Sequence, residues 1–109
     1  MLGYVLRFTQ GTERAFYCTQ QSGGRYLAMF RREEEITGAI AFLQEGQVRS
    51  TMPGVTMEAM GVPTREALLA IAHVCVPPVD GLAIALDFRA NGSVARWGFS
   101  DWDTLEVRC

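Results

Sequence analysis

A histidine and a cysteine two positions apart are the first residues whose types could do chemistry. Histidine is the commonest general base and cysteine a common nucleophile, and His73 and Cys75 fall in one predicted helix. Successive helical residues turn by about 100°, so the two side chains point about 200° apart and cannot act on each other. An enzyme that uses His73 would therefore need Cys18, Asp87 or Asp101 close to it in the fold. The sequence favours a non-catalytic protein.

We expect no cofactor and no metal. One histidine and three widely spaced cysteines contain no ligand pair at zinc spacing. Asp101 and Asp103 flank Trp102, but a calcium-binding loop needs more oxygen ligands than these carboxylates supply. The alternative interpretation is an aspartate-rich turn, in which the carboxylates bond nearby backbone N–H groups. The glycines at 23–24 are not followed by a clear helix, as a phosphate-binding loop would require.

Aromatic residues near the C-terminal end give the strongest indication of a binding surface. Trp97 and Phe99 are expected on one face of a strand, where core packing is the favoured interpretation and a binding surface is the alternative. Trp102 lies in a polar turn and is harder to bury. Tryptophan with arginine nearby is typical of interface hot spots. The candidate binding residues are Arg96, Trp97, Phe99, Asp101, Trp102 and Asp103.

The composition is that of one folded domain. The chain has 109 residues, of which 49% are hydrophobic and 20% charged, so it can bury a core without disulfides or metals. Its net charge of −2 argues against a general nucleic-acid binder. All ten basic residues are arginines, and because they are scattered along the sequence we interpret them as a property of composition rather than as an anion site.

The sequence indicates a cytoplasmic protein without a membrane partner. No apolar run is long enough to span a bilayer, and the first ten residues alternate like a strand instead of resembling a signal peptide. The cysteines at positions 18, 75 and 109 are odd in number and far apart. This argues against a disulfide framework and fits a reducing compartment.

The elements that must position these residues centre on a hairpin at 82–99. Asn91-Gly92 lies between two strand-like runs, which predicts a two-residue type I′ turn. We expect one face of the first strand of this hairpin to pack in the core and its other face to point away from the core. The expected core face holds Leu82, Ile84, Leu86 and Phe88.

Three short strands, at 2–9, 13–20 and 25–31, predict an antiparallel meander at the start of the chain. Residues 32–47 fit an amphipathic helix, with three glutamates in its first turn and Gly46 near its C-cap. Gly38 inside that helix costs about 1 kcal/mol relative to alanine, which leaves a strand as the alternative.

A second helix is clearer, because Thr64 is a good N-cap and prolines at 77–78 end it. Residues 48–52 are a short strand or a link, residues 56–60 can form one helical turn, and residues 105–109 can add a last strand. The predicted order is βββα(β)αβββ. We therefore expect one α+β domain with a mostly antiparallel sheet of five to six strands and two helices packed on one face.

Three hypotheses for function remain from the sequence. The first is a non-catalytic binding protein that recognises a protein partner or its own copy, as a homodimer, through the surface around Trp102. The second is a small-molecule binding protein with an apolar pocket between sheet and helices. The third is a small enzyme that uses His73. The expected lining of the pocket is Tyr4, Tyr17, Tyr26 and Trp97.

Overall fold

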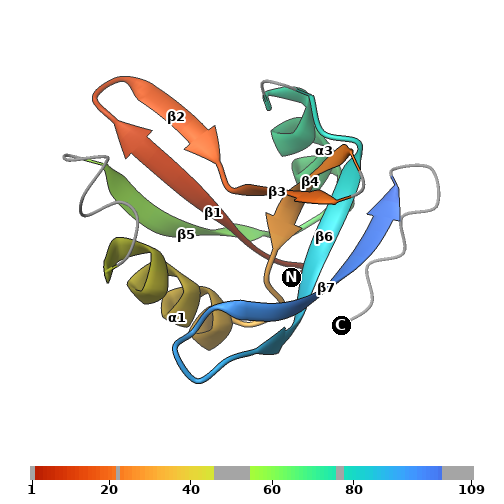
Figure 1. The fold of residues 1–109 in the computed structure, drawn as a ribbon. Helices are drawn as coiled ribbons and strands as arrows, with labels where there is room; N and C mark the ends of the chain where they lie inside the picture. Colours follow the sequence, from red (N-terminus) through yellow and green to blue (C-terminus); the bar gives the residue numbers. More distant parts are fainter. Residues whose placement is uncertain (1, 22, 46–54, 76–77, 102–109) are drawn as a thin grey trace.

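The computed structural model describes residues 2–21, 23–45, 55–75 and 78–101. Seven strands and two helices lie within these residues (Figure 1). In chain order they are β1 (Gly3–Gln10), β2 (Glu13–Phe16), β3 (Cys18–Gln21), β4 (Gly24–Met29), α1 (Glu33–Leu43), β5 (Thr56–Val62), α3 (Arg65–His73), β6 (Gly81–Phe88) and β7 (Val94–Asp101). The α+β class, the two helices and the mostly antiparallel pairing are confirmed.

The strands form two sheets, in the orders β2-β1-β5 and β3-β4-β6-β7, instead of the single sheet that was predicted. β2 and β3 are one arm that bends at Tyr17 and changes partner. Tyr17 donates its backbone N–H to the carbonyl of Leu6 on β1 (2.9 Å) and accepts from Ala28 on β4 (3.0 Å). Tyr4 and Phe30 also exchange two backbone hydrogen bonds of 2.8 Å, so the two sheets are joined at both places.

The two helices cover opposite faces of the strands, and the prediction of both on one face is wrong. Val5 and Leu6 are both fully buried, yet they belong to different hydrophobic clusters. Neighbouring strand residues point to opposite faces. Val5 packs in the cluster that contains Leu68 of α3, and Leu6 packs in the cluster that contains Ile36 of α1. Figure 1 shows the two helices separated by the strands.

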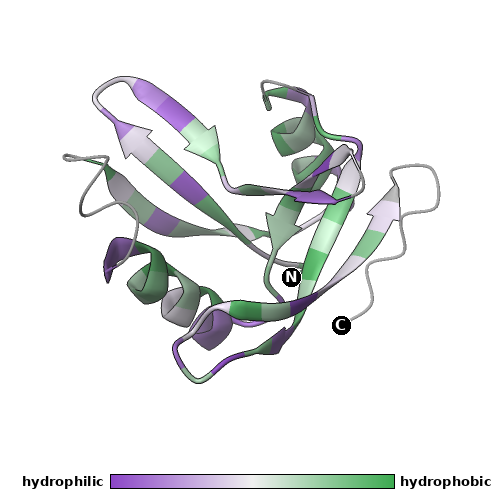
Figure 2. Cartoon of the chain, in the orientation of Figure 1, coloured by the Kyte–Doolittle hydropathy of each residue, from purple (hydrophilic) through white to green (hydrophobic). Residues whose placement is uncertain are grey.

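The strand β6 is buried on both faces, which the alternation in its sequence did not predict. Leu82 lies in the α3 cluster and Ala85 in the α1 cluster, and both are fully buried, as is Ala83. β6 lies between β4 and β7 and pairs with β4 in parallel, an arrangement found mainly where both faces of a sheet are covered. The strand is apolar along most of its length (Figure 2).

The hairpin between β6 and β7 is confirmed, but its turn differs from the prediction. Arg89 donates its N–H to the carbonyl of Ser93 (2.9 Å), and Gly92 donates to the carbonyl of Arg89 (3.0 Å). Gly92 has a φ of +92°. This is a three-residue loop closed by a left-handed glycine rather than a type I′ turn. Register shifts around Asp87 place Phe88 in the α1 cluster, so Phe88 leaves the predicted core face.

Residues 33–43 form the predicted helix rather than the alternative strand. The carboxylate of Glu35 accepts a hydrogen bond from the N–H of Arg32 (3.3 Å) at its start. Thr64 caps α3 as predicted, since its hydroxyl accepts from the N–H of Ala67 (3.1 Å). Residues 56–60, predicted as a helical turn, instead belong to β5, which pairs with β1 over its whole length. The predicted elements at 48–52 and 105–109, and Gly46, lie outside the described residues.

Candidate functional site

The sequence-predicted binding residues of β7 divide between surface and core. Arg96 is exposed and forms an ion pair with Asp87 across the hairpin (Nε to Oδ2, 2.6 Å), a kind of surface pair that contributes little to stability. Asp101 is the last residue of β7 and pairs with Gly81. Trp102 and Asp103 lie outside the described residues.

Trp97 and Phe99 lie on the α1 side of the sheet, where their strand neighbours are Ala85 and Ala83. Trp97 is partly buried in the α1 cluster and meets Phe30 edge-on, with ring centroids 6.0 Å apart. Phe99 is 38% exposed and meets Tyr26 of β4 edge-on at 5.0 Å. The aromatic row therefore continues from a covered end at Trp97 to an open end at Phe99.

A pocket of about 270 Å³ lies between α1 and β7. Four aromatic side chains line it, together with the guanidinium group of Arg89. This group donates a hydrogen bond to the carbonyl of Val94 (2.9 Å). Burial raises the pKa of Tyr17 above its usual value. Of the four residues expected to line an apolar pocket, Tyr17 and Trp97 line this one, whereas Tyr4 and Tyr26 do not. The principal lining residues are Tyr17, Phe30, Phe42, Arg89, Ser93 and Trp97.

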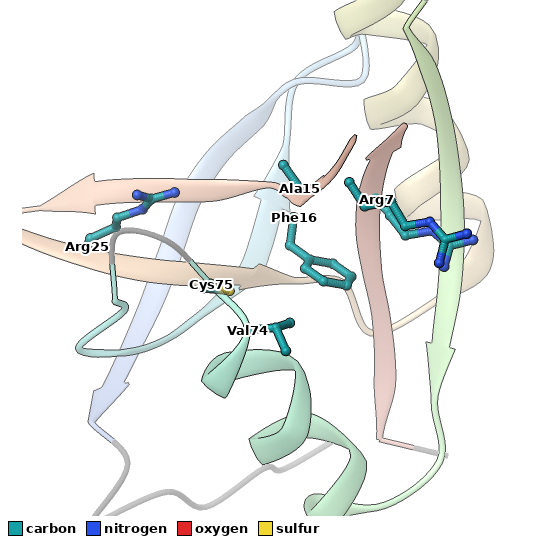
Figure 3. A pocket seen from close by; sticks show the side chains of 7 residues that line it. Arg7, Ala15, Phe16, Arg25, Val74 and Cys75 are labelled. Carbon is teal, nitrogen blue, oxygen red and sulfur yellow. The ribbon is translucent and has the colours of Figure 1, made fainter. Parts of the chain in front are cut away.

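A second pocket, of about 370 Å³, lies on the opposite side, between β1, the β2–β3 arm and the end of α3 (Figure 3). Its lining combines arginines with apolar side chains. Phe16 and Val74 lie between Arg25 at one end and Arg7 at the other (Figure 3). The complete lining is Arg7, Arg14, Ala15, Phe16, Arg25, Val74 and Cys75.

The arginines of this pocket were interpreted from sequence as scattered, but the fold gathers them. Strand residues two positions apart share a face, so Arg7 follows Val5 on the α3 side of β1. Arg25 precedes Leu27 on the α3 side of β4 in the same way. Val5 and Leu27 are both members of the α3 cluster. The signal in the sequence is an arginine two positions from a buried residue of the same strand. This signal indicates a shared pocket only when the strand order is known.

Cys75 lines this pocket and belongs to the α3 cluster, against which Cys18 also packs, a proximity that the sequence did not predict. Burial, followed by the influence of Cys18, raises the pKa of Cys75 to about 11, against a smaller lowering by Arg25. A thiol that keeps its proton at neutral pH is a poor nucleophile.

His73 is exposed in the last turn of α3. The helix ends there, so Cys75 follows it instead of continuing it as predicted, and the two residues line a common pocket of about 440 Å³. The Cys75 thiol donates to the carbonyl of Ile71 (3.4 Å). No group of three histidine, cysteine, aspartate or glutamate side chains that could hold a metal ion occurs among the described residues.

No family model, curated protein or solved structure matches this chain. Within the described part of the chain, no helix is long and apolar enough to cross a membrane.

Proposed function

We propose that this chain is a non-catalytic binding protein that associates with a second copy of itself or with another protein through β7 and the aromatic side chains beside it. The observation that carries the proposal is the open end of the aromatic row. Phe99 leaves 38% of its surface in water although Tyr26 packs against it. Large aromatic side chains at an open surface are typical anchors of protein interfaces.

The position of β7 in its sheet supports the same surface. β7 is the last strand in the order β3-β4-β6-β7, so in the described part of the chain its outer edge is not paired with another strand. Exposed edge strands present backbone donors and acceptors that a second strand can pair with. Trp102 and Asp103 follow β7 in the sequence and stay among the proposed binding residues, although they lie outside the described residues.

The test is light scattering over a concentration series, with reductant present, on the native chain and on Phe99→Ser. We expect a concentration-dependent dimer that Phe99→Ser weakens by about tenfold or more. Phe42→Ser is the matched control, because Phe42 is also 38% exposed but lies on α1. A native chain that stays monomeric at all concentrations would exclude self-association and leave a different protein as the partner to seek.

The α1–β7 pocket favours a second candidate function, the binding of a small planar molecule. Its aromatic walls offer stacking surfaces, and Arg89 and Ser93 offer polar contacts at the rim. A ligand that binds only the native state must raise the melting temperature. We expect Phe42→Ala to remove the shift produced by an aromatic ligand and Phe99→Ala to preserve it. A panel of aromatic compounds that leaves the melting temperature unchanged would count against this function.

A further inference from the structure

We infer that the pocket between Arg7, Arg14 and Arg25 binds a small amphiphilic anion, a carboxylate or phosphate ester that carries a short apolar chain. This site lies on the α3 side of the strands, whereas Phe99 and Trp97 lie on the α1 side. It is therefore independent of the association surface on β7.

The apolar part of the site is a hydrophobic surface that the fold leaves open. Val74 is 65% exposed although it directly follows α3. It lies opposite Phe16 across the pocket (Figure 3). Removing CH₂ groups from water is favourable, so a short alkyl chain on Phe16 and Val74 supplies useful affinity. The pocket volume of about 370 Å³ suits a small ligand.

The charged part of the site is formed by arginines with different degrees of neutralisation. Arg7 is held by Glu58 of β5, with its Nε 2.8 Å from Oε1. Within the part of the chain that the structure describes, the guanidinium groups of Arg14 and Arg25 form no hydrogen bond or ion pair with a side chain. Two uncompensated guanidinium groups therefore border the apolar surface.

A nearby carboxylate does not neutralise Arg25 through a side-chain pair. Asp80 accepts a hydrogen bond from the backbone N–H of Arg25 (3.0 Å), and its own N–H donates to the carbonyl of Arg25 (2.6 Å). These contacts fix the backbone at the start of β4 and leave the guanidinium group available. Guanidinium groups bind carboxylates and phosphates through paired N–H donors, which is why an anion is the ligand class that fits.

The direct test is isothermal titration calorimetry with a set of eight-carbon probes. Octanoate and octyl phosphate present the expected anion, octanol has the same chain without charge, and octyltrimethylammonium carries the opposite charge. We expect the two anions to bind at least about tenfold more tightly than octanol, and the cation not to bind. Binding of the anions should weaken as salt concentration rises.

Variants of the pocket locate the binding. Arg25→Gln and Arg14→Gln should each weaken octanoate binding by about tenfold, and Val74→Ser should weaken it by a smaller factor. Arg96→Gln is the matched control, because Arg96 is an exposed arginine in β7, outside this pocket. Circular dichroism of each variant checks that the fold is intact.

Three results would overturn the inference. Equal binding of octanol and octanoate would show that only the apolar surface contributes. Equal loss in Arg96→Gln and Arg25→Gln would show a general effect of net charge. Binding to phosphatidylglycerol vesicles without binding to free octanoate or octyl phosphate would assign the arginines to a lipid surface instead of a small ligand.

Discussion

Gly38, in the middle of α1, lies directly against Gly92 in the loop between β6 and β7. A Cβ atom added to Gly92 would collide with the carbonyl group of Gly38, whereas a Cβ atom added to Gly38 would lie 3.8 Å from the Cα of Gly92. A larger side chain is therefore excluded at Gly92 but tolerated at Gly38. The contact between the two glycines lets the helix approach the hairpin loop closely, beside the pocket between α1 and β7.

Gly92→Ala should lower the free energy of unfolding by about 3 kcal/mol, because a left-handed backbone and a steric collision act together. Gly23 is the matched control: its φ is +80° and an added Cβ would meet nothing within 4 Å. Gly23→Ala should therefore cost only about 1 kcal/mol, from backbone strain alone. Urea denaturation measures both values, and equal losses would contradict the contact with Gly38.

Gly38→Ala should raise the free energy of unfolding by about 1 kcal/mol. Alanine is the better helix former by this amount, and the nearest atom to the new Cβ lies at an ordinary van der Waals distance of 3.8 Å. The same denaturation experiment tests the change. A destabilised variant would mean that α1 and the β6–β7 loop are closer in solution than in the structure.

Replacing each of the two aromatic residues of β7 by alanine should show, from the loss of stability, which of them packs in the core and which lies at the surface. Trp97→Ala should cost about 3 kcal/mol, because Trp97 packs in the α1 cluster against Phe30. Phe99→Ala should cost less than about 1 kcal/mol, because Phe99 is more exposed and has Tyr26 as its ring neighbour. A loss of comparable size at Phe99 would show that its side chain is part of the core and weaken the proposed interface.

The raised pKa of Cys75 predicts a stability that falls at alkaline pH. The ordinary thiol pKa of 9.0 rises to about 11 in the folded chain, so between these values the unfolded state releases a proton that the native state keeps. Stability is thus unaffected by this group below pH 9 and declines as the pH rises towards 11.

Urea denaturation over this pH range compares the native chain with Cys75→Ala. The variant should be less stable at every pH, because Cys75 belongs to the α3 cluster, but should lose less stability with rising pH. Tyr17, whose pKa is also raised, contributes to the slope in both proteins and cancels in the comparison. Parallel pH profiles would be inconsistent with a raised Cys75 pKa.

Local signals in the sequence predicted several elements because their causes are local. Thr64 and Ala67 form the N-cap contact of α3 that the residue types indicate. The hairpin at Asn91-Gly92 was found from its turn residues, although the register shifts at Asp87 have no signature there. β5 was missed, because its stability comes from pairing with β1 and not from a regular alternation of its own side chains.

The burial of β6 and the arginine pocket could not be predicted, because both depend on strand order. Ala83 and Ala85 are small enough to suit either an open or a covered face, and Ala85 is buried because it packs in the α1 cluster with residues far away in the sequence. Arg7 and Arg25 are eighteen positions apart in the sequence. They share a pocket because the arm between them bends at Tyr17 and pairs with both of their strands.

The bend at Tyr17 has a consequence for how the chain unfolds. One residue supplies backbone hydrogen bonds to β1 and to β4, so neither sheet can detach without breaking pairing that belongs to the other. The amide protons of Tyr17 and Ala28 should therefore exchange with solvent only when the whole domain opens, at rates set by global unfolding and not by local fraying. We therefore expect the two sheets to unfold as a single cooperative unit.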